Sequence, residues 1–204
     1  MRTATRTVAS WLGIVAGFAG LEHGYFEIQH GNVQPASIMF SSMGAPCVPE
    51  KIWNACEPAM SLLPNYLWMG IVTLILGLAI MVWSAMFIQR THGGLVLIVL
   101  SIVFLLFGGG FFPPLIGIIG GAAGTQINQP LSGKPGAVTR FIGRLGILPL
   151  IILLVYLVGQ FPIGYFFNDG LMSVMGLGLL LILILLPLSV YAAYAHDAGQ
   201  GANL

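Results

Sequence analysis

Long hydrophobic runs separated by polar, turn-rich segments are the dominant pattern along this chain. The runs cover about residues 8–26, 65–87, 145–159 and 171–194 and contain almost no charged side chains. A helix needs about 20 apolar residues to cross a bilayer. The pattern therefore predicts an all-α fold, a polytopic membrane helical bundle with about four full transmembrane helices.

The first run has some features of a signal peptide, because Arg2 and Arg6 precede it and small residues lie within it. Its length and its regularly spaced glycines favour instead a helix that is retained. We expect it to be the first transmembrane helix.

A fifth apolar region, at 95–124, is broken in its middle. Three glycines, Gly108–Gly110, are followed by Pro113 and Pro114, and such a sequence cannot continue a regular helix. We expect a broken or re-entrant helical hairpin that returns to the side from which it came. The alternative is a surface loop between two thin helices. Helix breaks often line binding sites in transporters, so Gly109 and Gly110 are candidate site residues.

One face of the first predicted helix is lined by small residues. A step of about 100° per residue places the members of this face within about 40° of Gly13. They are Gly13, Gly17, Gly20, Gly24, Glu27 and Gly31. Because a face of this kind lets membrane helices approach closely, we expect tight helix packing along it.

Three polar side chains, His23, Glu27 and His30, lie on one arc of the same helix. Imidazole and carboxylate groups are ligands for cations such as zinc. We therefore name these three residues as candidate ion ligands and as candidate metal ligands, whereas Glu22 points the opposite way. The alternative is that they are interfacial anchors where the helix leaves the bilayer.

Composition fixes the class of protein. The chain has 204 residues, of which 57% are hydrophobic and 6% charged, and its mean hydropathy is +0.96. Soluble domains are about a quarter charged. We expect residues 1–204 to form a single integral-membrane domain with the lipid bilayer as its partner. A net charge of +1 without a basic cluster argues against nucleic acid.

A polar, turn-rich segment at about 31–62 separates the first two hydrophobic runs. We expect it to form a small extracytoplasmic cap. Cys47 and Cys56 both lie in it, nine positions apart, and an oxidising compartment would favour a disulfide between them. The alternative is a pair of free thiols.

Charge sorting predicts the orientation in a cell membrane, inner or plasma. Basic residues favour the cytoplasmic side, which places the N-terminus with Arg2 and Arg6 in the cytoplasm and the cysteine loop outside. If the broken hairpin returns, all basic residues except Lys51 are cytoplasmic, and five of the six acids are outside.

Three functions are compatible with these patterns. The first is a small transporter or an ion- or proton-coupled membrane component with an acidic, outward-facing site. The alternative is a non-catalytic accessory subunit of a larger membrane complex or a homo-oligomer, assembled through glycine-lined helix faces. The third is a membrane metalloprotein that holds a divalent cation on His23, Glu27 and His30. The chain lacks a phosphate-binding glycine loop, a nucleophile elbow and a zincin motif, so we expect no enzymatic activity and no other cofactor.

Overall fold

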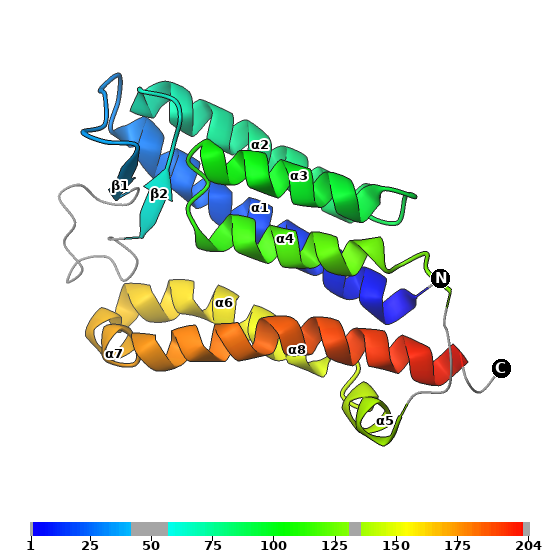
Figure 1. Cartoon of the computed structure of the whole chain (residues 1–204). Coiled ribbons are helices and arrows are strands. Elements are labelled where there is room, and N and C mark those ends of the chain that lie inside the picture. The colour runs from blue at the N-terminus through cyan, green and yellow to red at the C-terminus, as the bar shows by residue number, and fades with distance from the viewer. Residues whose placement is uncertain (1, 42–56, 131–135, 202–204) are drawn as a thin grey trace.

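The structure, a computed structural model, describes residues 2–41, 57–130 and 136–201. In these ranges the chain forms eight helices and one antiparallel two-stranded sheet (Figure 1). In chain order the elements are α1 (Thr3–Gln29), β1 (Met39–Ser41), β2 (Pro58–Met60), α2 (Tyr66–Met86), α3 (Gly93–Leu106), α4 (Phe112–Thr125), α5 (Ala137–Gly143), α6 (Leu148–Phe166), α7 (Asn168–Ser173) and α8 (Met175–Gly201). Four of these helices, α1, α2, α6 and α8, are long and apolar enough to cross a membrane. The predicted membrane helical bundle is confirmed.

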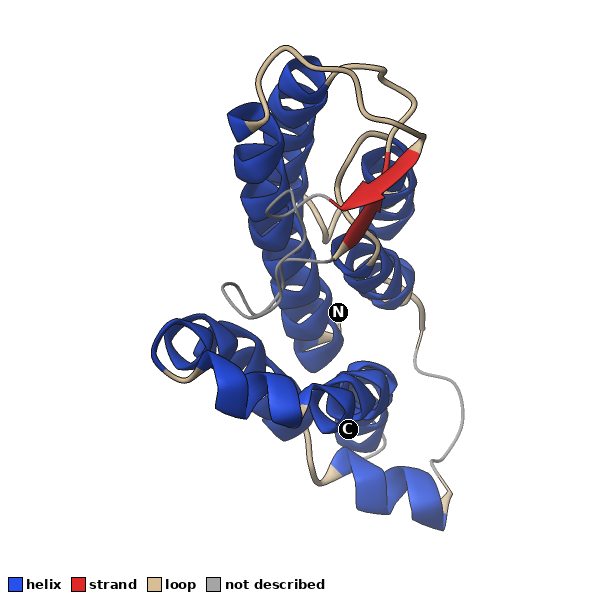
Figure 2. Cartoon of the chain, turned by 90° about the vertical axis from the view of Figure 1, so that its left-hand side faces the viewer, coloured by secondary structure: helices blue, strands red, loops and turns tan. Residues whose placement is uncertain are grey.

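The helices form two groups that meet along the first half of α1. One group contains α1 to α4 with the small sheet at one end, and the other contains α5 to α8 (Figures 1 and 2). The contact between them is a buried apolar cluster in which Val8 and Leu12 of α1 meet Leu153 of α6 and Leu186 of α8. Helix α1 therefore packs against both groups: against α2 and α4 within its own group, and against α6 and α8 of the other.

Glycines bring α1 and α2 into backbone contact. A methyl group built on Gly24 would lie 2.9 Å from the carbonyl oxygen of Gly70, and one built on Gly77 would lie 2.8 Å from that of Gly17. The two crossing points are seven residues apart on each helix, about two turns. The predicted small-residue face is buried from Gly13 to Glu27.

The glycine faces of α1 and α4 are buried in contacts between helices of the same chain. Those of α1 face α2, α3 and α4, and those of α4 face α1 and α3. Gly31, the last predicted member of the face, lies beyond the end of α1 with φ at +74°. Assembly with further subunits through these faces stays a prediction that the fold does not favour.

Helices α3 and α4 form the predicted broken hairpin. Each has 14 residues and is therefore about 21 Å long, shorter than the roughly 30 Å hydrocarbon core. They lie against each other, and the chain leaves the hairpin at the end where it entered (Figure 1). Pro113 and Pro114 do not break the second helix; they occupy its first turn, where a backbone N–H has no helical partner to lose.

Several other boundaries differ from the prediction. Helix α6 continues through Pro162 to Phe166 instead of ending near Gly159, and the residues that follow Gly159 continue the apolar composition of the run. The short helices α5 and α7 and the two strands were not predicted. Each has seven residues or fewer, too few for a hydrophobic period to be visible.

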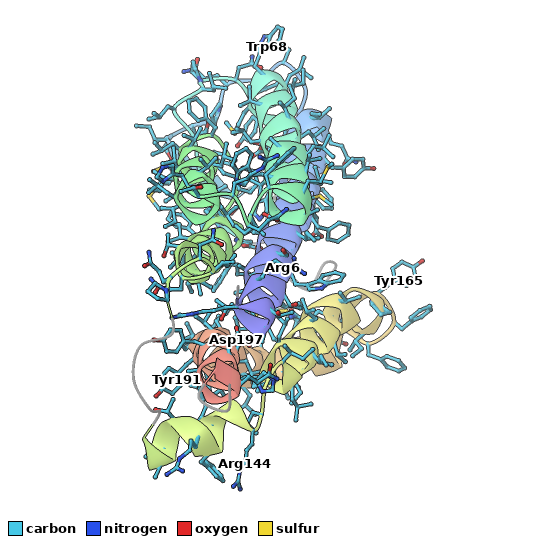
Figure 3. The ribbon with its side chains drawn as sticks, turned by 90° about the vertical axis from the view of Figure 1, so that its right-hand side faces the viewer. Arg6, Trp68, Arg144, Tyr165, Tyr191 and Asp197 are labelled. Atoms are coloured by element: carbon cyan, nitrogen blue, oxygen red, sulfur yellow. The ribbon has the colours of Figure 1, made fainter. Side chains whose placement is uncertain are left out.

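A carboxylate from the last helix caps the first one. Asp197 accepts hydrogen bonds from the backbone N–H of Ala4 at 3.0 Å and of Thr5 at 2.9 Å, and from Thr5 Oγ1 at 2.7 Å. Helix N-termini leave such N–H groups unsatisfied and favour negative charge. Asp197 lies beside the start of α1 in Figure 3. It therefore ties the two helix groups together at this end.

We expect Gly17→Leu to destabilise the protein by about 3 kcal/mol or more, since overpacking against rigid backbone cannot be relieved by a side-chain movement. Even a methyl group at Gly17 would lie 2.5 Å from the carbonyl oxygen of Gly77. Thermal unfolding in detergent measures the loss. The matched control is Gly176→Leu on α8, where a methyl group meets nothing within 4 Å and the change should stay within about 0.5 kcal/mol. Equal tolerance at both positions would show that the α1–α2 contact does not need glycine.

Candidate functional site

Two ionisable side chains of α1 are buried near the end of the helix that faces the sheet. His23 is 1% exposed and Glu27 is 0% exposed. They lie one turn apart: Glu27 belongs to the small-residue face that packs against α2 and the α3–α4 hairpin, and His23 lies next to this face. The tight packing of this face therefore encloses both groups.

The glycines that break the hairpin lie directly against these two side chains. A methyl group on Gly108 would lie 2.6 Å from Glu27 Oε1, and one on Gly110 would overlap the imidazole ring of His23. Gly108 and Gly110 also have φ at +100° and +73°, a conformation that side chains disfavour. Both the turn and its contact with α1 therefore require glycine here.

Thr73 on α2 connects Glu27 to the backbone of the break. Its Oγ1 lies 3.1 Å from Glu27 Oε2 and 2.6 Å from the carbonyl oxygen of Phe107. Thr73 is fully buried. One hydroxyl group thus bridges the α1 carboxyl group and the residue immediately before Gly108.

The sheet at the end of the bundle is bonded to the same turn. The N–H of Gly108 donates to the carbonyl oxygen of Met60 at 2.9 Å, and the N–H of Leu62 donates to that of Leu106 at 3.0 Å. Glu57 lies just before β2, and its Oε1 lies 3.4 Å from His23 Nε2. Glu57 is 20% exposed, so it is the member of the group nearest to solvent.

One oxygen of Glu27 has no hydrogen-bond partner among the described residues. Oε2 meets Thr73, but Oε1 is buried without a donor. One turn deeper, the ring of Phe104 fills the space that methyl groups on Gly20 and Gly109 would occupy. Within the described part of the chain, the carboxyl group therefore lies against glycine and has a single hydrogen-bond contact, with Thr73.

The structure brings together some of the predicted site residues and separates others. Gly110 lies against His23, and Glu27 lies against Gly108 of the same turn, whereas Gly109 faces the ring of Phe104. His30 lies at the C-terminal end of α1 and stacks on Tyr66 with ring centroids 4.5 Å apart.

The fold does not test the predicted metal site or the predicted disulfide. Among the described residues, no group of three or more His, Cys, Asp or Glu side chains is placed to hold a metal ion. Cys47 and Cys56 lie outside the described residues. A metal on His23, Glu27 and His30 and a bridge between the cysteines both stay predictions.

Sequence reasoning missed three members of the site: Thr73, Glu57 and Gly108. Thr73 had a signal, because it is the only polar side chain between Met69 and Trp83, and a hydroxyl in the middle of an apolar helix needs a partner. Glu57, like Glu50, could join the site only if the cap folded back over it, and the sequence does not determine that fold.

Comparison of the chain with models of protein families, with curated proteins and with solved structures gives no match in any of the three. The interpretation of the site therefore rests on its own geometry.

We expect Gly110→Ala to destabilise the protein more than Gly31→Ala, although both residues have nearly the same positive φ. Gly31 has no atoms within 4 Å of the new methyl group, so its loss is that of the left-handed conformation alone, about 1 kcal/mol. At Gly110 the contact with His23 adds about 1–3 kcal/mol. Thermal unfolding of the two variants in the same detergent gives the difference. Losses of equal size would contradict the contact between the break and the imidazole.

Proposed function

We propose that this protein is an ion- or proton-coupled component of membrane transport, in which Glu27 is the binding group. The observation that carries this proposal is the fully buried carboxyl group with one oxygen that lacks a donor within the described part of the chain. A buried carboxylate is costly unless a proton, a cation or several donors neutralise it. Thr73 supplies one donor at most, so the group is well suited to a positively charged ligand.

The surroundings of Glu27 support the same interpretation. Ionisable residues inside membrane helices are rare and mark ion or proton pathways in many transport proteins. Irregular backbone at membrane depth occurs where it lines a site or cavity. Here the two features coincide, because the carboxyl group of Glu27 lies against Gly108 of the hairpin break.

The orientation that fits this function places the site on the extracytoplasmic side. The described basic residues belong to the start of α1, to the α2–α3 connection and to α5 with the residue that follows it, all at the end of the bundle that holds both termini (Figure 1): Arg2, Arg6, Arg90, Arg140 and Arg144. The positive-inside rule assigns that end to the cytoplasm. Glu22, Glu27, Glu57 and Asp169 belong to the opposite end, where they attract cations.

A second candidate, the accessory subunit, is favoured by the exposure of the second helix group. In the most apolar stretches of α6 and α8, 24% and 28% of the residues are buried, against 50% in α1. Tyr165, at the far end of α6, is 83% exposed and projects from the bundle (Figure 3). Lipid or another protein covers this surface, and a partner that co-purifies stoichiometrically would favour the accessory role.

Glu27→Gln should abolish ion movement while the protein stays folded, since the amide keeps the shape of the side chain and removes its charge. The assay is the decay of an imposed proton or sodium gradient across liposomes that contain the purified protein and an internal indicator dye. The expected rate for the variant is that of protein-free liposomes. Metal analysis of the same preparation tests the divalent-cation hypothesis.

Glu22→Gln is the matched control for this experiment. It removes the same charge from the same helix, one residue from His23, at a position that is not part of the buried group. It should retain the wild-type rate. Wild-type protein that dissipates neither gradient, or a Glu27→Gln variant as active as the wild type, would contradict the transport proposal.

The predicted orientation and disulfide are tested by one labelling experiment on Cys47 and Cys56, the two cysteines of the chain. A membrane-impermeant maleimide added to intact cells should not react before reduction and should react after it. Closure of so small a ring would stabilise the cap by about 2–3 kcal/mol. Reaction without reduction would exclude the bridge, and no reaction after reduction would place the loop on the other side.

A further inference from the structure

The hydroxyl group of Thr73 lies between two acceptors but has one proton to donate. The distance to the carbonyl oxygen of Phe107 is 2.6 Å and the distance to Glu27 Oε2 is 3.1 Å. O–H···O hydrogen bonds have their most frequent length near 2.7–2.8 Å. The geometry therefore assigns the proton of Thr73 to Phe107, and Thr73 presents a lone pair to Glu27.

A lone pair of Thr73 that faces an ionised carboxylate is repulsive. The contact becomes a hydrogen bond if Glu27 carries a proton on Oε2 and donates it to Thr73 Oγ1. The bonds then run in one direction, from Glu27 to Thr73 and from Thr73 to the carbonyl oxygen of Phe107. In this state Oε1 is the oxygen of a neutral acid, which is much less costly to bury without a donor than a charged oxygen.

We propose that the ligand of this site is a proton on Glu27, and that Thr73 transmits the presence of this proton to the α3–α4 turn. The proposal rests on the proposed function in taking Glu27 as the binding group, and it goes further by naming the ligand and its structural effect. The carboxylate takes one proton from a hydronium ion of the solvent, which leaves as water, to form the neutral acid, and on deprotonation it returns the proton to a water molecule. No other bond is made or broken.

Loss of the proton changes what holds the turn. Thr73 then donates its own proton to the carboxylate, and the carbonyl oxygen of Phe107 loses its side-chain donor. The turn keeps the bonds from the N–H of Gly108 to Met60 and from the N–H of Gly109 to Phe104. With φ at +100° and +73°, Gly108 and Gly110 give this segment the freedom to move when one anchor is removed.

The groups around Glu27 favour a proton over a metal cation. Among the described residues, Thr73 supplies the one oxygen in hydrogen-bond contact with Glu27, whereas Ca²⁺ takes six to eight oxygen ligands and Mg²⁺ requires six in near-octahedral geometry. In the described part of the chain, the titratable groups beside Glu27 are His23, one turn away on α1, and Tyr66 on α2, and Glu57 faces His23. Helices α3 and α4 contain no titratable residue between Gly93 and Thr125.

Infrared difference spectroscopy of the purified protein tests whether the proton is present. A protonated carboxyl group has a C=O stretch above the amide band, and the wild-type protein should lose one such band as the pH is raised. Glu27→Gln should lack this band at every pH, and Glu22→Gln should retain it. Absence of the band from the wild-type protein, or its replacement by a sodium-dependent carboxylate band, would overturn the proposal.

Hydrogen exchange of the segment 104–111, followed by mass spectrometry, tests whether the turn responds. Comparison of variants at the same pH removes the intrinsic pH dependence of exchange. In Glu27→Gln the side-chain amide can donate to Thr73 permanently, so the turn should stay protected at high pH. In the wild-type protein it should exchange roughly fivefold to tenfold faster there, about the factor of one net hydrogen bond.

Two substitutions at Thr73 complete the test. Thr73→Ser keeps the hydroxyl group and should reproduce the wild-type response. Thr73→Val keeps the shape and removes the bridge, so exchange should be fast in both protonation states while the infrared band of Glu27 remains. If Thr73→Val responds to pH as the wild type does, Thr73 does not transmit the proton and the proposal is wrong.

These outcomes are separate from those of the transport assay. A protein that shows the infrared band of Glu27 and a pH-dependent α3–α4 turn but moves no ions would disprove transport. The proposed coupling of the Glu27 proton to the turn would still hold. A protein that moves sodium but lacks the infrared band would support transport and disprove the proposed proton on Glu27.

Discussion

The close approach of α1 to its neighbours is the constraint on which the rest of the structure depends. At Gly17 and Gly24 the backbone of α1 touches that of α2, and no side chain separates the two helices. A larger side chain beside this face must therefore be enclosed by the neighbouring elements, as His23 and Glu27 are. The burial of the polar group at the end of α1 is thus a consequence of how the helix packs.

Two buried carboxyl groups, that of Asp197 on α8 and that of Glu27 on α1, differ in how well their surroundings stabilise a negative charge. Asp197 accepts two backbone N–H bonds and one hydroxyl bond at a helix N-terminus, where negative charge is favoured. Its charge is fully compensated, and it joins the first and last helices. Among the described residues, Glu27 has one hydroxyl contact, and its Oε1 has no hydrogen-bond partner. It is the less satisfied of the two, which is why we interpret it as a binding group.

The hairpin break connects α3 to α4 through residues 107–111, and each of its three glycines has its own neighbour. Gly108 lies against Glu27, Gly109 against the ring of Phe104, and Gly110 against the ring of His23. The same turn is bonded to β2 through Gly108. A movement of the turn would therefore alter the surroundings of the carboxyl group, the apolar ring beneath it and the sheet above it together.

The sequence alone determined the membrane class, the main helices, the hairpin and the packed face of α1. These depend on local composition and on a helical period that survives any tertiary arrangement. It also named His23, Glu27 and Gly110 as candidates, because ionisable side chains in an apolar helix and glycines at a break are visible without a fold. Only the tertiary structure decided that Thr73 and Glu57 join them, that His30 does not, and that Asp197 caps the first helix. These contacts join residues as far as 193 positions apart, and they depend on where glycine contacts and the apolar cluster place each helix.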